Sequence, residues 1–283
     1  MIDDIEDLLR RYLKLTTDSQ VSERVPFEID QRIVGSVTPD DAQLIASRVP
    51  GVELSSDALE VLPVCAPDAP SALHAIAKAL RDAGRAPHWR NEQLPVCTDD
   101  GMLVGSIERA CVRILGIRTF AVHLIGQCAQ MDQLDSLSPS LANSTFWLQR
   151  RSPDKAVDPN MLDTLAGGLI GMENGARESF RLGLQREISE EAGLDPGCYD
   201  NPTYVDTVRM RWQVPEGFFE EDCIVFYARL MPGASPQNRD GEVAEFMRVD
   251  RAGLLARIDA GELTETASIA SLLSLRHIAS TTN

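Results

Sequence analysis

Apolar side chains recur at helical spacing in two parts of the N-terminal region and alternate with polar ones between them. Residues 2–15 and 70–84 carry their apolar positions on one face, which predicts two amphipathic helices. Residues 26–37 and 51–62 alternate instead, which predicts two strand pairs. Together these segments predict a small α+β unit that ends near residue 117.

The rest of the chain alternates strands with fewer helices. Strands are predicted at residues 119–125, 146–149, 203–213 and 222–231. Helices are predicted at residues 178–194, 251–260 and 265–278. The polar residues 126–145 lack periodicity and predict a long flexible loop between the first two strands.

The helix predicted at residues 178–194 has an unusual acidic face. Glu187, Glu190 and Glu191 follow the spacing i, i+3, i+4 and therefore share one side of a helix. Like charges at this spacing weaken an isolated helix by a few tenths of a kcal/mol each, roughly. A divalent cation explains the cluster, because hard cations take carboxylate oxygens as ligands. The alternative interpretation is a solvent-exposed acidic helix.

Several other features of this helix are in register with the acidic face. An apolar stripe that can pack on a sheet falls at Phe180, Leu184, Ile188 and Ala192. Arg186 stands four residues before Glu190 and can pair with it, and Gly193 suits a left-handed helix end. A loop in which the backbone can approach an anion or a metal is predicted at Gly167, Gly168, Gly171 and Gly175.

From Glu178 to Leu194 the sequence resembles the signature of the Nudix hydrolases. Glu178 is followed by seven residues and then by the run from Arg186 to Leu194, without a gap. The resemblance implies an α/β fold, a Nudix α/β/α sandwich with a mixed sheet over residues 118–283. One departure is the loop from Gly168 to the first glutamate, which has nine residues where the family normally has five.

The Nudix resemblance implies hydrolysis of a diphosphate linked to another group X, with Mg²⁺ or Mn²⁺ as the cofactor. The implied metal ligands are Glu187, Glu190, Glu191 and a backbone carbonyl from Gly168. Glu178 and Arg186 are implied to hold the helix and the loop together, and Glu187 is the expected base. The physics agrees, because a metal-bridged diphosphate loses charge on its oxygens and is attacked by an activated water.

Residues 20–125 resemble, more loosely, the N-terminal domain of Nudix proteins related to thiamine pyrophosphokinase. The segments that carry this resemblance are residues 26–37, 88–92 and 116–123, together with residues 162–168. It implies an N-terminal domain over residues 1–117 and thiamine diphosphate, or a damaged analogue, as substrate. Two alternatives stay open: a hydrolase of nucleoside diphosphates linked to X, such as ADP-ribose or dinucleotides, and a non-catalytic Nudix-fold binding module.

Further site residues are expected outside the helix. Arg150 and Lys155 are candidates for the diphosphate, because they belong to a basic cluster just before the glycines. Candidates for stacking on an aromatic X group are Trp89, Trp212, Phe218 and Phe219. Asp240 and Glu242 lie where Nudix domains often draw an extra ligand or base. For each group the alternative is structural: an exposed basic turn, core aromatics or solvent-facing acids.

Composition narrows the partners. The net charge of −16 over 283 residues argues against sequence-independent nucleic-acid binding, which depends on lysine and arginine. No apolar run approaches a membrane span, and the acidic N-terminus resembles neither a signal nor a transit peptide. Six dispersed cysteines predict reduced thiols. We therefore expect a cytoplasmic protein that binds a small-molecule diphosphate, with the oligomeric state open between monomer and homodimer.

Overall fold

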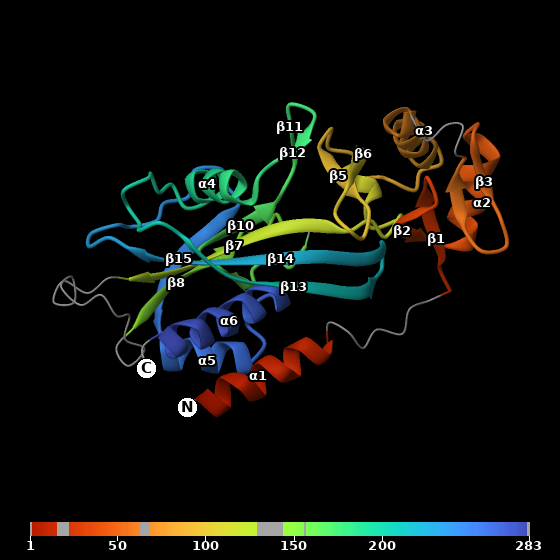
Figure 1. The fold of residues 1–283 in the computed structure, drawn as a ribbon. Helices are drawn as coiled ribbons and strands as arrows, with labels where there is room; N and C mark the ends of the chain where they lie inside the picture. Colours follow the sequence, from red (N-terminus) through yellow and green to blue (C-terminus); the bar gives the residue numbers. More distant parts are fainter. Residues whose placement is uncertain (1, 16–22, 63–67, 129–143, 156, 282–283) are drawn as a thin grey trace.

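The computed structural model describes residues 2–15, 23–62, 68–128, 144–155 and 157–281. They fold into a small α+β unit beside a larger layered sandwich (Figure 1). The helices are α1 (Ile2–Leu15), α2 (Pro39–Arg48), α3 (Ala69–Asp82), α4 (Phe180–Glu190), α5 (Arg251–Asp259) and α6 (Glu265–Thr281). A 3₁₀ turn near the site covers Arg109–Cys111.

The small unit is built on a four-stranded sheet. Its strands are β1 (Val25–Ile29), β2 (Arg32–Val37), β3 (Val52–Leu54) and β4 (Leu59–Val61), in the order β2-β1-β4-β3. Strands β1 and β4 are parallel, and helices α2 and α3 pack on the buried face around Phe27 and Leu73. The two predicted strand pairs and the helix predicted at residues 70–84 are confirmed, whereas the helix predicted at residues 2–15 forms but packs on the sandwich instead. The hairpin of β5 (Gln93–Cys97) and β6 (Leu103–Glu108) was not predicted.

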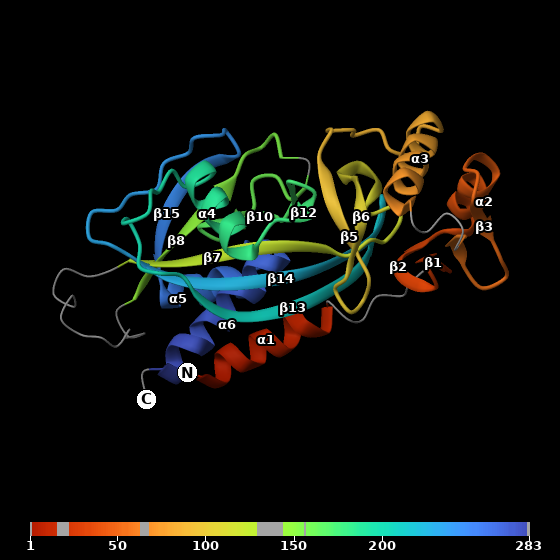
Figure 2. The same cartoon turned by 45° about the horizontal axis from the view of Figure 1, so that its top comes forward.

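The sandwich has a mixed sheet with helices on both faces. Its main strands are β7 (Thr119–Cys128), β8 (Thr145–Arg151), β13 (Thr203–Val214), β14 (Gly217–Leu230) and β15 (Val243–Asp250), in the order β13-β14-β7-β8-β15. Strand β14 is parallel to β7, and the other neighbours are antiparallel. Helix α4 covers one face, and α5, α6 and α1 cover the other (Figure 2). The predicted α/β/α sandwich with a mixed sheet is confirmed.

The sheet divides between β7 and β8, and this division creates room for a site. The two strands pair only at Gly126–Trp147 and Gln127–Phe146. Beyond that point β10 (Ala166–Leu169) pairs with β7, and β9 (Leu162–Asp163) pairs with β8. The expectation that Gly167 and Gly168 lie in a loop is therefore wrong, because both pair with β7 as strand residues.

Helix α4 is shorter than the predicted residues 178–194, because it covers Phe180–Glu190 and Glu191 is its C-cap. The hydroxyl of Ser179 accepts the N–H of Leu182 at the N-cap, and Gly193 adopts a φ of +62° just beyond the end. The longer loop before it is an ordered hairpin of β11 (Met172–Glu173) and β12 (Ala176–Arg177). Its turn has positive φ at Asn174 and Gly175, as a two-residue hairpin requires.

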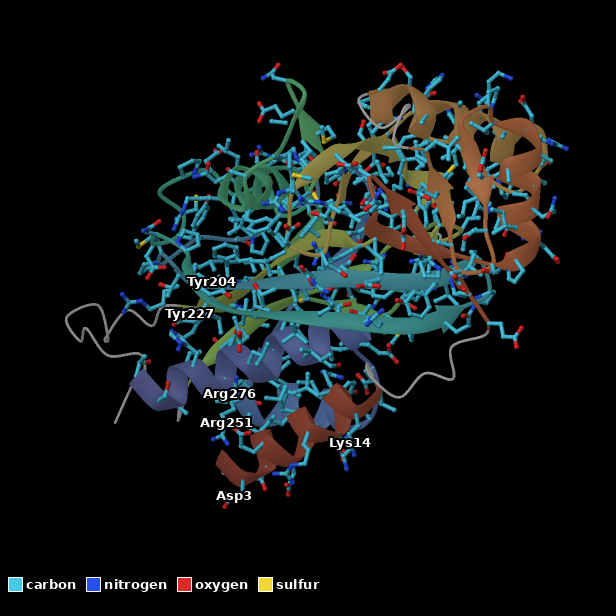
Figure 3. The ribbon with its side chains drawn as sticks, turned by 45° about the vertical axis from the view of Figure 1, so that its right-hand side comes forward. Asp3, Lys14, Tyr204, Tyr227, Arg251 and Arg276 are labelled. Atoms are coloured by element: carbon cyan, nitrogen blue, oxygen red, sulfur yellow. The ribbon has the colours of Figure 1, made fainter. Side chains whose placement is uncertain are left out.

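Helix α1 packs on the sandwich rather than on the small unit. Ile5, Leu9 and Tyr12 are buried against α6, which lies between α1 and strand β13 (Figure 3). Arg276, labelled on α6 in Figure 3, pairs with Asp206 at 3.3 Å and reaches Glu6 at 4.0 Å. The domain division after residue 117 stays a prediction, and this packing joins the first helix to the core of the second part.

Three other expectations meet the structure only in part. Residues 126–128 continue β7 instead of starting a loop, and residues 129–143 lie outside the described residues. The five described cysteines form no disulfide, and Cys65 lies outside the described residues. In the described ranges, no helix combines the length and the apolar character needed to cross a membrane.

Candidate functional site

A cavity of about 1290 Å³ opens where the sheet divides. Its walls come from α4, from β10, from the hairpin of β13 and β14, and from the loop around Asp240. The small unit contributes as well, through residues 91–93, Arg109 and Arg113. The cavity therefore lies between the two parts of the molecule, and both parts line it.

Arg186 is the centre of the acidic helix face. Its guanidinium donates to Glu178 at 3.1 and 3.2 Å, to Glu187 at 2.6 Å and to Glu190 at 3.3 Å. A further bond, of 3.1 Å, goes to the carbonyl of Leu169 in β10. These contacts raise the pKa of Arg186 and keep it charged. The fork thus fixes α4 to the glycine strand, in agreement with the role implied for Arg186 and Glu178.

Glu191 lies deeper in the cavity and has different partners. Its side chain is 3% exposed and accepts the N–H of Gly167 at 2.9 Å and the amide of Gln149 at 3.0 Å. Lys155 Nζ lies 3.6 Å from its second oxygen. Burial raises the pKa of Glu191 to about 8, and the neighbouring Glu187 adds to the rise. The protein alone therefore does not compensate this carboxylate fully.

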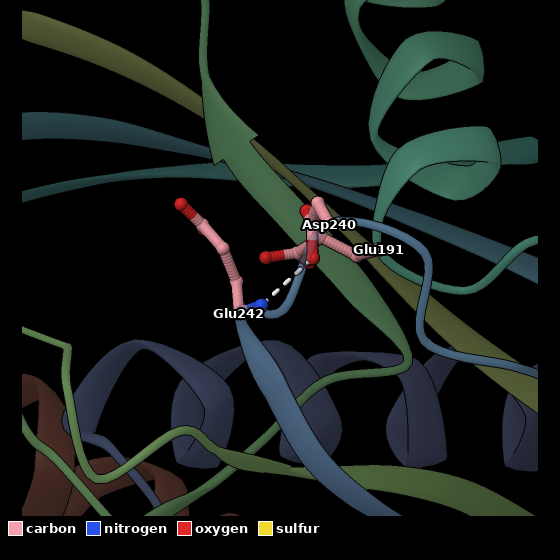
Figure 4. Close-up of side chains that lie close together, drawn as sticks. All are labelled: Glu191, Asp240 and Glu242. Carbon is pink, nitrogen blue, oxygen red and sulfur yellow. Dashed lines mark hydrogen bonds between the residues drawn. The ribbon is translucent and has the colours of Figure 1, made fainter.

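A loop carries two further acids to Glu191. Oxygens of Glu191, Asp240 and Glu242 lie within 4.8 Å of one another (Figure 4). The N–H of Glu242 donates to Asp240 at 2.8 Å, shown as the dashed line in Figure 4, and Glu242 also pairs with Lys155. The predicted trio is thus divided: Glu187 and Glu190 contact Arg186, whereas Glu191 groups with the two loop acids.

The site holds more negative charge than its own cations can balance. Six carboxylates line this end of the cavity, at Glu178, Glu187, Glu190, Glu191, Asp240 and Glu242. Arg186 and Lys155 are the two cations that contact them among the residues that the structure describes. Burial also raises the pKa of Glu187. The available ligand atoms are carboxylate oxygens, which are hard ligands, and together with the excess negative charge they suit Mg²⁺ or Mn²⁺.

Gly168 has no room for a side chain. A Cβ at this position would overlap the carboxylate of Glu187, so the strand backbone and the glutamate are in direct contact. Only glycine lets α4 bring Glu187 this close to β10. The backbone of Gly168 consequently lies beside the acids, where the sequence resemblance implies that its carbonyl is a metal ligand.

Of the six residues expected to contact the substrate, three line the cavity, namely Lys155, Trp212 and Phe219, and three do not, namely Arg150, Trp89 and Phe218. Arg150 lies in β8 and pairs with Glu245 at 2.7 Å. Trp89 donates to Asn91 and lies under Arg81, and Phe218 is buried beneath Arg24 and Arg211. The roles of Arg150, Trp89 and Phe218 in substrate binding stay predictions that this geometry does not support.

The structure brings other residues into the cavity that sequence reasoning missed. Arg151 lines it and pairs with Asp163 at 2.8 Å. The signal for Arg151 was present in β8, because the apolar Phe146 and Leu148 face α5 and α6, which places Gln149 and Arg151 on the opposite face. His123 and Glu221 also line the cavity, but both come from strands whose pattern alone gives no functional signal.

Comparison with known proteins agrees with this geometry. Residues 139–266 match the family described as NUDIX domain. Nudix hydrolase 20, chloroplastic, of Arabidopsis thaliana is 31% identical over 173 residues, which are 60% of this chain and 42% of that protein. An uncharacterized protein of Saccharomyces cerevisiae is 29% identical over 175 residues, 56% of this chain and 46% of the other. The chain spans less than half the length of these curated relatives.

Solved structures show similarity of lower degree. A crystal structure of a Deinococcus radiodurans protein has a TM-score of 0.47 and 22% identity, covering 66% of this chain and 99% of the other. The Nudix domain of Shewanella oneidensis NrtR, complexed with ADP ribose, has a TM-score of 0.37 and 15% identity, covering 58% and 86%. The family match confirms the predicted Nudix fold, whereas the thiamine pyrophosphokinase-related subfamily stays a prediction.

The contact between Gly168 and Glu187 predicts a strong effect of Gly168→Ala. The added methyl group would overlap the carboxylate of Glu187, which is the far end of a flexible side chain, so Glu187 should turn away and leave its place among the acids. Mn²⁺ titration should show weaker ion binding, while the midpoint of thermal unfolding changes little. Gly171→Ala is the matched control, since a Cβ there lies 3.9 Å from its nearest neighbour. Equal behaviour of the two variants would contradict the close packing.

The raised pKa of Glu191 predicts how stability changes with pH in EDTA. Folding favours the neutral acid, so its stabilising contribution is complete below the ordinary glutamate pKa and disappears as the pH rises through about 8. The free energy of unfolding should fall over that interval by up to about 1.4 kcal/mol per pH unit, and the melting temperature should fall with it. Glu191→Gln should reduce the slope, and Mg²⁺ should restore wild-type stability at high pH. A slope unchanged by the substitution would exclude Glu191 as its cause.

Proposed function

We propose, on the basis of the Nudix domain matched over residues 139–266, that the protein hydrolyses a diphosphate linkage in a small molecule and requires Mg²⁺ or Mn²⁺. The observation that carries this proposal is the uncompensated acidic end of the cavity beside a glycine strand. Its carboxylates come from α4 and from the loop before β15, so the fold gathers them from distant parts of the chain.

The acids differ in the parts they take. The proposed metal ligands are Glu187, Glu190, Glu191, Asp240, Glu242 and the carbonyl of Gly168. The ion, when bound, neutralises phosphate oxygens and makes a water molecule more acidic. Arg186 orients Glu187 and Glu190 through direct hydrogen bonds, and Glu178 holds the guanidinium in place. Arg186 and Glu178 therefore act by positioning.

Glu187 remains the proposed base that accepts the proton of the attacking water. It is 8% exposed, lies against the Gly168 backbone and has a raised pKa because of burial. Lys155, which contacts Glu191 and Glu242, and Arg151, which pairs with Asp163, provide positive charge in the cavity that suits phosphate oxygens. The diphosphate would thus lie beside the acids and their ion, within reach of these two cations.

The N-terminal residues favour thiamine diphosphate, or a damaged analogue, as substrate, through their resemblance to thiamine pyrophosphokinase-related Nudix proteins. A nucleoside diphosphate linked to X, such as ADP-ribose or a dinucleotide, is the second candidate, and a Nudix-fold module that only binds a ligand is the third. A cytoplasmic location, the monomeric or homodimeric state, and the absence of nucleic-acid and membrane partners belong to the same proposal.

Removing single metal-facing charges should abolish activity without unfolding the protein. We expect Glu190→Gln and Glu191→Gln to lower turnover by about two orders of magnitude or more, because each removes a negative charge from the ion site. Glu245→Gln is the control, since this glutamate pairs with Arg150 outside the cavity. Phosphate release and thermal unfolding are measured together. Wild-type turnover in both test variants would remove these residues from the site.

A hydrolysis screen with Mg²⁺, in which the products are separated by chromatography, distinguishes the three functional candidates, because ADP-ribose and dinucleotides are cleaved without release of inorganic phosphate. Thiamine diphosphate, oxidised thiamine diphosphate analogues, ADP-ribose and dinucleotides are compared at equal concentration. Turnover of thiamine compounds should exceed that of the nucleotides at least tenfold in kcat/KM, roughly 1.4 kcal/mol of transition-state discrimination. Turnover restricted to ADP-ribose or dinucleotides would overturn the thiamine assignment, and tight binding without any turnover would favour the binding module.

A further inference from the structure

The cavity has a second end that the acidic cluster does not use. We call it the aromatic end and define it by Trp212, Phe219 and Glu221, which all line the cavity. Trp212 and Phe219 are cross-strand partners in β13 and β14, and their rings stack with centroids 4.1 Å apart at 23°. Arg113, from the small unit, lies over Phe219 at 5.6 Å. The result is a rigid, flat wall.

Glu221 is a buried carboxylate with almost no compensation. It stands two residues after Phe219 on the same strand, so both side chains project from the same face. It is 7% exposed and accepts a 3.0 Å hydrogen bond from Thr119. Within the described ranges this is the only hydrogen bond to the carboxylate of Glu221, and no arginine or lysine nitrogen lies within 4.0 Å of that carboxylate.

The nearest cations have other partners. Arg113 pairs with Glu216 at 3.6 Å, and Arg109 pairs with Glu92 at 2.9 Å. A buried carboxylate without a counter-ion is unfavourable unless a ligand supplies a donor or a positive charge. Burial accordingly raises the pKa of Glu221 to about 7.

We propose that Trp212, Phe219 and Glu221 bind the group attached to the diphosphate, and that this group is a planar nitrogen heterocycle with a donor or positive charge facing Glu221. The inference rests on the proposed function and defines the substrate class. A flat ring matches the stacked wall. An alkyl chain would leave Glu221 buried without a donor.

The test compares three probes on the full chain: thiamine diphosphate, ADP and inorganic pyrophosphate, which lacks a ring. Glu221→Gln should lower the ratio of kcat/KM for a ring-bearing probe to that for pyrophosphate at least tenfold, because a charge-assisted contact is lost. Glu220→Gln is the matched control, since the next residue of β14 faces the opposite side and pairs with Arg211. Its ratio should stay within about twofold of wild type.

Calorimetric titration in EDTA separates this inference from the proposed function. Ring-bearing probes should bind at least tenfold more weakly to Glu221→Gln and to Trp212→Leu, with unchanged thermal unfolding as the folding control. If no diphosphate is hydrolysed but binding still depends on these residues, the hydrolase fails and the subsite stands. Equal ratios and affinities in wild type and Glu221→Gln, or no preference of wild type for a ring, would overturn the subsite.

Discussion

The physical constraint that governs this molecule is an excess of negative charge at one end of a cavity, where Glu187 and Glu191 are buried and Asp240 and Glu242 are exposed. Carboxylates from α4 and from the loop before β15 converge there, and Arg186 and Lys155 balance only part of their charge. The surrounding structure is arranged to tolerate this excess. Arg186 joins α4 to β10, and the absent side chain of Gly168 lets Glu187 approach the strand. The backbone N–H of Gly167 and the side-chain amide of Gln149 both donate to Glu191. An apolar core built from Leu184 and Ile188 holds the helix against the sheet behind them.

The sequence predicted those parts of the fold that depend on local periodicity. The acidic face of α4, its apolar stripe and its glycine end all follow from spacing, and the strands of both units were recognisable. The residues that meet across the cavity were harder, because their neighbours are distant in the chain. Glu191 meets Asp240 through sheet topology, and the glycines became a strand because β7 offered a free edge. Arg150 and Arg151 are adjacent, yet strand alternation alone decides which one lines the cavity.

The small unit also contributes to the site. Its residues 91–93, Arg109 and Arg113 line the cavity, and Arg113 lies over a ring that belongs to the sandwich. The backbone carbonyl of Arg113 accepts the N–H of Phe218, so the two parts share a hydrogen bond beside the aromatic wall. In addition, the peptide of Gly217 packs so closely on Arg113 that a side chain there would overlap it. The shape of the cavity therefore depends on how the two parts are joined, and a structure of the sandwich alone would lack one wall.

The division of the sheet connects the proposed ion site to the backbone of β10. Since β8 leaves β7 after two paired positions, the amide of Gly167 has no strand partner on that side and donates to Glu191 instead. A proposed metal ligand is thereby hydrogen-bonded to the main chain of the central sheet. Binding of a cation would hold Glu191 in place and favour this hydrogen bond, whereas a shift of β10 along β7 would break it. Ion affinity and the register of β10 therefore depend on the same hydrogen bond, and hydrogen exchange of the Gly167 amide would report how often this bond opens.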